Sequence, residues 1–298
     1  MNIIQKAEYY IVMSIFLIIR ILPKPIQQLL AFILYFLVAH VVRYRRNVIL
    51  TNLRNSFPEK SEKEIRRIAR KYYLHLSYMI VEAIVLRYSS RKHISKCIQV
   101  PQYDELERLF SKNKRLLVIL GHYGNWEFGS ARMAGLNHRV AAIYKKLGSP
   151  IFEVFYQKMR TNLGVEPVEM KNTMRKLVEM RDNDDSYALL SVADQTPTKK
   201  DIHHWITFLN QDTGVFIGTE RLAKKFDMAV LYAEIVRNGF CKFTGTYKVI
   251  TETPNDTPEF EITDKFFSML EESIKRHPEN WVWSHRRWKH KRTQEQVL

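Results

Sequence analysis

The sequence predicts an α/β fold: a central mixed β-sheet flanked by helices, preceded by N-terminal membrane-anchoring helices. Through the middle of the chain, short apolar runs alternate with segments of helical periodicity, which is typical of such sheets. Two longer apolar runs stand near the N-terminus. The chain has 298 residues, 46% of them hydrophobic. A sizeable core can therefore be buried, and the composition is not that of a disordered protein.

The two N-terminal apolar runs cover residues 9–22 and 29–42 and are separated by a Pro-Lys-Pro break. Each run is shorter than the roughly 20 residues that span a bilayer. We expect the first run, with its flanks and a snorkelling Arg20, to cross the membrane and the second to form an interfacial helix. A shallow hairpin in one leaflet is an alternative. A cleaved signal peptide is disfavoured, because no small-x-small cleavage site follows the first run.

Basic residues follow the second apolar run, whereas only Lys6 precedes the first. They are Arg43, Arg45, Arg46 and Arg54. The positive-inside tendency therefore places the bulk of the chain on the cytoplasmic side, with this cluster against anionic head groups. We predict an anchor and interfacial helix in residues 1–45 and a single folded domain in residues 46–298.

The formal net charge of +16 favours an anionic partner, such as a membrane surface, nucleic acid or a phosphorylated substrate. No helix-turn-helix, zinc-finger or ribonucleoprotein motif occurs, so nucleic acid is not the predicted partner. The only cysteines, Cys97 and Cys241, form no metal-ligand pattern, and no metal site is predicted. A basic, non-enzymatic binder of membrane or nucleic acid stays an alternative.

The folded part begins with a helical segment at 61–88, which Ser61 and Glu64 open as a capping box. Predicted strands are 115–120, 139–144, 187–193, 228–236 and 240–250. Predicted helices lie near 126–135, 150–163, 170–181, 215–226 and 257–276. The alternating pattern of the last strand suggests an antiparallel neighbour.

The motif GHYGNWE, residues 121–127, directly follows the predicted strand 115–120. Its His122 and Glu127 can meet only if the chain turns between them, and its two glycines permit such a turn. Ligand sites of α/β sheets lie at this end of the strands. A carboxylate on one imidazole nitrogen leaves the other free to take a proton from a hydroxyl. We predict His122 as general base with Glu127 as its partner, the alternative being a surface histidine and a helix-capping glutamate.

This motif resembles the His-x-x-x-x-acid block of glycerolipid-type acyltransferases. Its Trp-Glu ending is similar to that of the late acyltransferases of lipid A biosynthesis, the lauroyl/myristoyl transferase family. Other blocks resemble that family in the same order, namely 52–53 with 57–59, 143–145 with Arg160, 193–197 with 208–209 and Gly218, and 283–288. The likeness extends from the anchor to about residue 290. One mild departure is Lys145, where the family commonly has arginine.

The resemblance implies a glycerolipid-acyltransferase-like fold, with residues 46–298 as the catalytic domain. It implies an O-acyltransferase that moves a fatty acyl group from an acyl carrier protein thioester to a hydroxyl of a lipid A precursor. Such an enzyme would work at the cytoplasmic face of the inner membrane without metal or cofactor. The acceptor could instead be a lysophospholipid, an aminolipid or another glycolipid. A hydrolase is a further rival, although no Gly-x-Ser-x-Gly elbow occurs.

The same resemblance assigns roles to single residues, with His122 and Glu127 as the catalytic pair. Residues expected to bind substrate are Asn125, Trp126, Arg160, Asp194, Gln195, Arg286 and Arg287. The last two belong to a basic C-terminal stretch that binds phosphate or the acidic carrier protein, or is simply a solvated tail. We also expect main-chain N–H groups near 124–126 to stabilise the oxyanion of the reaction.

Overall fold

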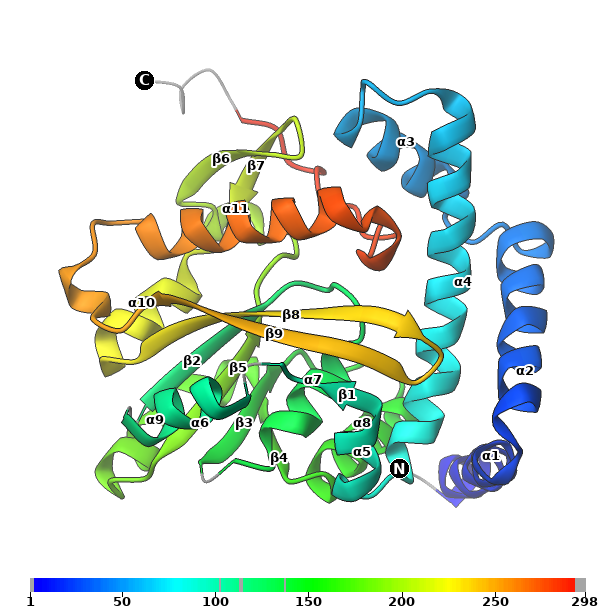
Figure 1. Cartoon of the computed structure of the whole chain (residues 1–298), viewed down its shortest axis with the longest axis horizontal. Helices are drawn as coiled ribbons and strands as arrows, with labels where there is room; N and C mark the ends of the chain where they lie inside the picture. The colour runs from blue at the N-terminus through cyan, green and yellow to red at the C-terminus, as the bar shows by residue number, and fades with distance from the viewer. Residues whose placement is uncertain (1–2, 102, 113–114, 137, 293–298) are drawn as a thin grey trace.

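The computed structural model describes residues 3–101, 103–112, 115–136 and 138–292. At its centre lies a seven-stranded sheet of order β1-β9-β8-β2-β5-β3-β4 (Figure 1). The strands are β1 (Ile98–Gln99), β2 (Arg115–Leu120), β3 (Arg139–Tyr144), β4 (Val165–Glu169), β5 (Tyr187–Val192), β8 (Ala229–Gly239) and β9 (Lys242–Thr251). Strands β8, β2, β5, β3 and β4 run parallel, and β9 returns antiparallel to β8. The predicted mixed sheet is confirmed, while an acyltransferase-like fold stays a prediction.

Both faces of the sheet are covered, which explains why its central strands are continuous apolar runs. In β2, Leu117 and Ile119 face a cluster formed with α9, α10 and α11, whereas Leu116 and Val118 face α6 and α7. These and the remaining helices of the region are α5 (Arg91–Cys97), α6 (Tyr103–Lys112), α7 (Trp126–Met133), α8 (Pro150–Asn162), α9 (Thr173–Asp182), α10 (Gly218–Phe226) and α11 (Glu261–Arg276). Short 3₁₀ turns are η2 (Met170–Asn172), η3 (Lys199–Asp201), η4 (Pro254–Asp256) and η5 (Pro278–Asn280).

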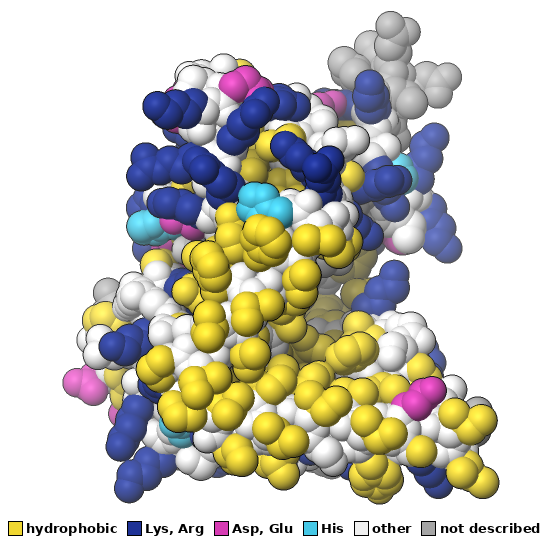
Figure 2. Space-filling model, turned by 90° about the vertical axis from the view of Figure 1, so that its right-hand side faces the viewer, with side chains coloured by type: hydrophobic (Ala, Val, Ile, Leu, Met, Phe, Trp, Pro, Cys, Tyr) yellow, Lys and Arg dark blue, Asp and Glu magenta, His cyan; other side chains and the backbone are white. Residues whose placement is uncertain are grey.

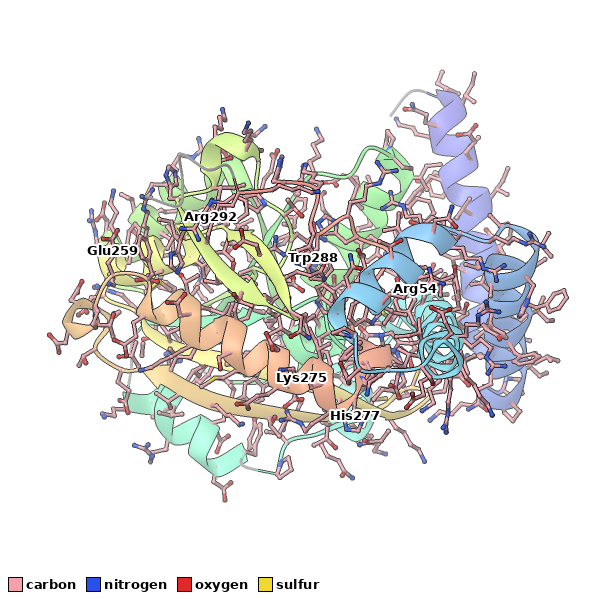
Figure 3. The ribbon with its side chains drawn as sticks, turned by 90° about the horizontal axis from the view of Figure 1, so that it is seen from above. Arg54, Glu259, Lys275, His277, Trp288 and Arg292 are labelled. Carbon is pink, nitrogen blue, oxygen red and sulfur yellow. The ribbon has the colours of Figure 1, made fainter. Side chains whose placement is uncertain are left out.

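A separate hairpin of β6 (His204–Phe208) and β7 (Gln211–Val215) was not predicted from the sequence. It lies beside α11, and Trp288 donates its indole hydrogen to Thr213 of the hairpin at 2.8 Å (Figure 3). Because β7 continues to Val215, α10 begins three residues later than the predicted helix 215–226. The edge strand β4 was also missed, since Pro167 and two glutamates interrupt its apolar pattern.

The N-terminal part is helical throughout. It consists of α1 (Ile3–Ile21), α2 (Lys24–Phe36), the π-helix η1 (Leu37–Val41), α3 (Arg46–Ser56) and α4 (Glu62–Arg87). The predicted capping box at Ser61 and Glu64 is confirmed as the start of α4, which is one helix. Helix α2 runs beside α4, and α1 crosses below (Figure 1). The buried Gln27 fixes this corner, because its amide lies 3.0–3.1 Å from three carbonyl oxygens at the end of α1.

Helices α1, α2 and η1 present a broad apolar surface, which we call the apolar face (Figure 2). Its exposed residues include Ile4, Tyr10, Ile11, Ile15, Ile18, Leu29, Phe32, Ile33, Phe36, Leu37, Val41 and Val42. Among the described residues, only Lys24–Val41 forms a helix long and apolar enough to span a membrane. We expected the first run to be the span; however, α1 carries Lys6, Glu8 and Arg20. Membrane topology and the boundary at residue 45 stay predictions.

Candidate active site

The register of two neighbouring strands brings a histidine and an aspartate together. Leu120 ends β2 opposite Val192, which ends β5, and Ala193 N–H donates to the Leu120 carbonyl at 3.0 Å. Two residues beyond each strand lie His122 and Asp194. The imidazole Nδ1 is 2.6 Å from Asp194 Oδ1, and the main-chain N–H of His122 donates to Oδ2 at 2.8 Å. The site thus lies at the carboxyl edge of the parallel strands, as predicted.

Asp194 is a buried carboxylate with only 2% of its surface exposed. Besides the two groups of His122, it accepts a hydrogen bond from the Trp281 indole N–H at 2.6 Å. Burial by itself would raise the pKa of Asp194, but His122 and these donated hydrogen bonds hold that pKa below its ordinary value. Asp194 is therefore ionised and can only accept hydrogen bonds.

The protonation pattern of His122 follows from its two neighbours. Because Nδ1 faces a carboxylate, it must carry the ring hydrogen, and in neutral imidazole Nε2 is then an acceptor. The amide nitrogen of Gln195 lies 3.0 Å from Nε2 and can donate to it. Gln195 is exposed and His122 is 19% exposed, so Nε2 can be reached from outside once Gln195 moves. This nitrogen is the atom that can take a proton.

Glu127 has a different partner from the one expected. Both its carboxylate oxygens accept from Arg160, Oε2 from Nε at 3.1 Å and Oε1 from Nη2 at 2.5 Å. The prediction that Glu127 is the partner of the imidazole is wrong. The chain does turn between the two residues, but Glu127 stands in the first turn of α7 and points toward α8, whereas the strand register places Asp194 beside His122.

The Glu127–Arg160 pair is a buried, two-pronged ion pair, with 10% and 15% of the two side chains exposed. The guanidinium also lies 5.7 Å from the ring centre of Tyr144 and 5.9 Å from that of Tyr156. Burial disfavours the charged form of Arg160, yet the Glu127 carboxylate raises its pKa above the ordinary value. Removal of either partner would leave the other charge buried without compensation.

Gly124 shapes the loop between β2 and α7. Its φ is +61°, and a Cβ there would stand 1.6 Å from the carbonyl oxygen of Ile235, so only glycine fits. Its N–H donates to Asn280 O at 2.9 Å, and Val282 N–H donates to His122 O at 3.1 Å. The expectation that the Gly124 N–H serves an oxyanion is therefore wrong. For the N–H groups of Asn125 and Trp126 it stays a prediction.

Asn125 and Trp126 flank this loop in different ways. The buried Asn125 donates its amide hydrogen at 2.9 Å to Glu82, a fully buried carboxylate that also pairs with Arg237 and accepts from Cys241 N–H. Asn125 thus anchors the loop to α4. The partly exposed Trp126 packs edge-on against His122, with 4.9 Å between ring centres. Glu82 was not predicted, although an acidic residue in the apolar stripe of a helix was a signal for it.

The comparisons with known proteins identify one family along almost the entire chain. Residues 1–290 match the family model of the bacterial lipid A biosynthesis acyltransferases. The chain belongs to this family. It is 23% identical over 272 residues to the lipid A biosynthesis palmitoleoyltransferase of Escherichia coli K12, covering 90% of this chain and 86% of that protein. The same values hold for the lipid A biosynthesis acyltransferase of Shigella flexneri. The family predicted from the sequence is confirmed, which supports an acyltransferase with a lipid acceptor.

In this acyltransferase the C-terminal block 283–288 mainly holds the loop that carries Asp194 and Gln195. Thr196 donates its N–H to His285 Nε2 at 3.1 Å and its hydroxyl to the carbonyl of Arg286 at 3.0 Å. The Arg286 side chain is exposed. Arg287 is buried instead, donates to Gly214 O at 2.9 Å, and has its pKa lowered to about 10 by that burial. Such burial argues against Arg287 as a contact for a solvated anion.

Proposed function

We propose that this family member is a membrane-attached O-acyltransferase with His122 as general base. It would move a fatty acyl group from an acyl carrier protein thioester to a hydroxyl of a lipid A precursor. The observation that carries the proposal is the His122–Asp194 pair, in which Asp194 holds the hydrogen on Nδ1 and leaves Nε2 as a base. Family membership supports the acyltransferase chemistry and the lipid acceptor.

The chemical step needs few groups. The acceptor hydroxyl takes the place of the Gln195 amide at Nε2, and its proton moves to the imidazole while its oxygen attacks the thioester carbonyl. Asp194 stabilises the resulting imidazolium. The tetrahedral intermediate then expels the carrier thiolate, which takes the proton from His122 and leaves as a thiol. General-base help of this kind contributes about 10²–10⁴-fold in rate.

Arg160 is proposed to contact an anionic group of the substrate while Glu127 holds it in place. The hydrogen bonds to Glu127 use Nε and Nη2 of the guanidinium and leave Nη1 for another acceptor. Glu127 thereby acts on the substrate through Arg160 and not on the imidazole. A positioned guanidinium beside aromatic rings suits a phosphate or a similar anion.

The apolar face is proposed to hold the enzyme on the cytoplasmic side of the inner membrane. Its exposed aliphatic and aromatic residues belong to helices that also pack on the catalytic body, through Tyr9 and Met13 of α1 and Ala31 of α2. Arg43 and Arg46, which follow the face, are exposed and suit anionic head groups. Such an arrangement brings the lipid acceptor to the enzyme by diffusion within the membrane.

The decisive experiment is mass spectrometry of a lipid A precursor incubated with the full-length protein and acyl carrier protein thioester. We expect a product heavier by one acyl chain, lost in His122→Ala. A lysophospholipid, an aminolipid and a second glycolipid serve as parallel acceptors. His204 of β6 is a matched control, because its Nε2 lies 2.7 Å from Asp264 of α11 in another His–Asp pair. Thioester hydrolysis without any acylated lipid would contradict the proposal.

A further inference from the structure

A cavity of about 290 Å³ opens where the apolar face ends and the basic residues begin. It lies between η1, the start of α3 and the first turns of α4. Its lining residues are Ala39, His40, Arg46, Leu50, Lys63, Arg66, Ala69, Arg70 and Tyr73. This volume lies at the lower limit of ligand pockets and suits part of a larger ligand.

The lining has two chemically different parts. Ala39, Leu50 and Ala69 belong to, or pack against, the main hydrophobic cluster and form an apolar wall. Around the wall stand Arg46 and three basic residues of α4. Those three, at positions 63, 66 and 70, recur at spacings of three and four residues and so share one helix face. In Figure 2, apolar side chains appear among Lys and Arg side chains just beyond the end of the apolar face.

These cations have little anionic compensation within the described part of the chain. Arg66 lies 3.7 Å from Glu62, which is engaged more closely by Arg54. No ion pair involves Lys63 or Arg70 among the described residues. Helix α3 begins at Arg46 without an acidic residue in its first turn, so its positive end adds to the local field. A ligand with a phosphate would supply the missing negative charge.

Irregular backbone geometry helps to form the cavity. The π-helix Leu37–Val41 widens the end of α2 and places His40 at the cavity. Such π turns occur often at functional sites. Arg43 and Arg45 then take left-handed φ values of 51° and 47°, turning the chain back so that α3 starts beside α4.

We propose that this cavity binds one anionic phospholipid of the surrounding bilayer. Its phosphate would lie among Arg46, Lys63 and Arg70, and the start of an acyl chain would follow the apolar wall. The exposed Leu37, Val41 and Val42 flank the lining residues at 39 and 40 along the chain, so the cavity lies at head-group level when the apolar face is in the membrane. An acidic protein would match the charges but not the apolar wall. This site goes beyond the proposed acyl transfer, since it lies apart from His122 and takes a lipid that is not transformed.

The test is native mass spectrometry of the detergent-solubilised full chain, titrated with dioleoyl phosphatidylglycerol or dioleoyl phosphatidylcholine. We expect one saturable phosphatidylglycerol and weaker binding of phosphatidylcholine. The double variant Lys63→Gln/Arg70→Gln should weaken phosphatidylglycerol binding roughly tenfold to thirtyfold, because it removes two positive charges that attract an anionic head group. The matched control, Lys225→Gln/Lys248→Gln, changes two exposed lysines on α10 and β9 and should bind as the native chain does.

A second variant tests the apolar wall. Leu50→Gln keeps every charge and should weaken phosphatidylglycerol binding, while the unfolding temperature in detergent checks that the variant is folded. Equal binding of the two lipids would overturn the proposal. A parallel titration uses acyl carrier protein without an acyl chain. A charge variant that loses this carrier protein but keeps lipid would also overturn the proposal, because the cavity would then be a docking site for protein. The assay contains no acyl donor, so its result is independent of acyl transfer.

Discussion

Two buried carboxylates of the site, Asp194 and Glu127, are chemically alike but have different partners. Asp194 follows a sheet strand and holds an imidazole whose other nitrogen faces the exposed Gln195. Glu127 stands in the first turn of a helix and is closed off by two hydrogen bonds from Arg160. The difference shows that closeness in the sequence does not determine which carboxylate pairs with the imidazole of His122. Here the register of two parallel strands selects it.

The largest effect is expected at the base itself. His122→Ala should lower kcat by up to about 10⁴-fold, the upper end of general-base help, because it removes the imidazole proposed to take the hydroxyl proton. Acylated lipid is measured by mass spectrometry at saturating donor and acceptor. His204→Ala, in the second His–Asp pair, should retain native turnover. Near-native turnover in His122→Ala would remove the base from the mechanism.

Asp194→Asn should have the next largest effect, about 10²–10³-fold in kcat, within the range of general-base help. An amide nitrogen facing Nδ1 would favour the ring hydrogen on Nε2, which then cannot accept the hydroxyl proton. Glu127→Gln is the matched comparison, because it removes the same charge from a carboxylate without contact to the imidazole. A pH–rate profile should change in Asp194→Asn but keep its midpoint in Glu127→Gln. Equal shifts in the two variants would contradict the distinction between these carboxylates.

Glu127→Gln should instead act on stability and substrate handling. Breaking a buried ion pair by removing one partner costs about 3–5 kcal/mol, because the remaining charge stays buried. We expect a lower free energy of unfolding in detergent and a higher KM. The double variant Glu127→Gln/Arg160→Gln should recover part of the stability, since it leaves no uncompensated charge. Additive losses in this double-mutant cycle would show that the two side chains do not interact.

Much of this arrangement could be predicted from the sequence. The apolar runs of β2 and β5 predicted the parallel core of the sheet, and the glycine motif correctly predicted that His122 lies at the carboxyl edge of its strands. The hairpin β6–β7 and the edge strand β4 could not be predicted, because their residues lack a continuous apolar or alternating pattern. Their structure depends on packing against α11, Trp288 and the neighbouring strand β3.

The partner of the histidine could not be predicted by counting along the motif. Asp194 lies 72 residues from His122, and only the pairing of Leu120 with Val192 shows that the two must meet. The resemblance did single out Asp194 and Arg160, but their pairing depends on the strand order and on where α7 and α8 point. Likewise, residue type alone could not separate the exposed Arg286 from the buried Arg287.

The smallest expected effect is on the pH dependence of stability. It concerns His285, whose ring accepts a hydrogen bond from Thr196 in the loop that carries Asp194. Burial lowers the pKa of His285 from its ordinary value of 6.5 to about 4, so the folded state keeps this ring neutral where the unfolded state is protonated. Its contribution to stability is therefore present above pH 6.5 and is lost as pH falls from there toward 4. His285→Gln keeps an acceptor for the Thr196 N–H without titrating, so its unfolding midpoint in urea should fall less over this interval. Parallel pH dependences in the two proteins would assign the acid sensitivity to other groups.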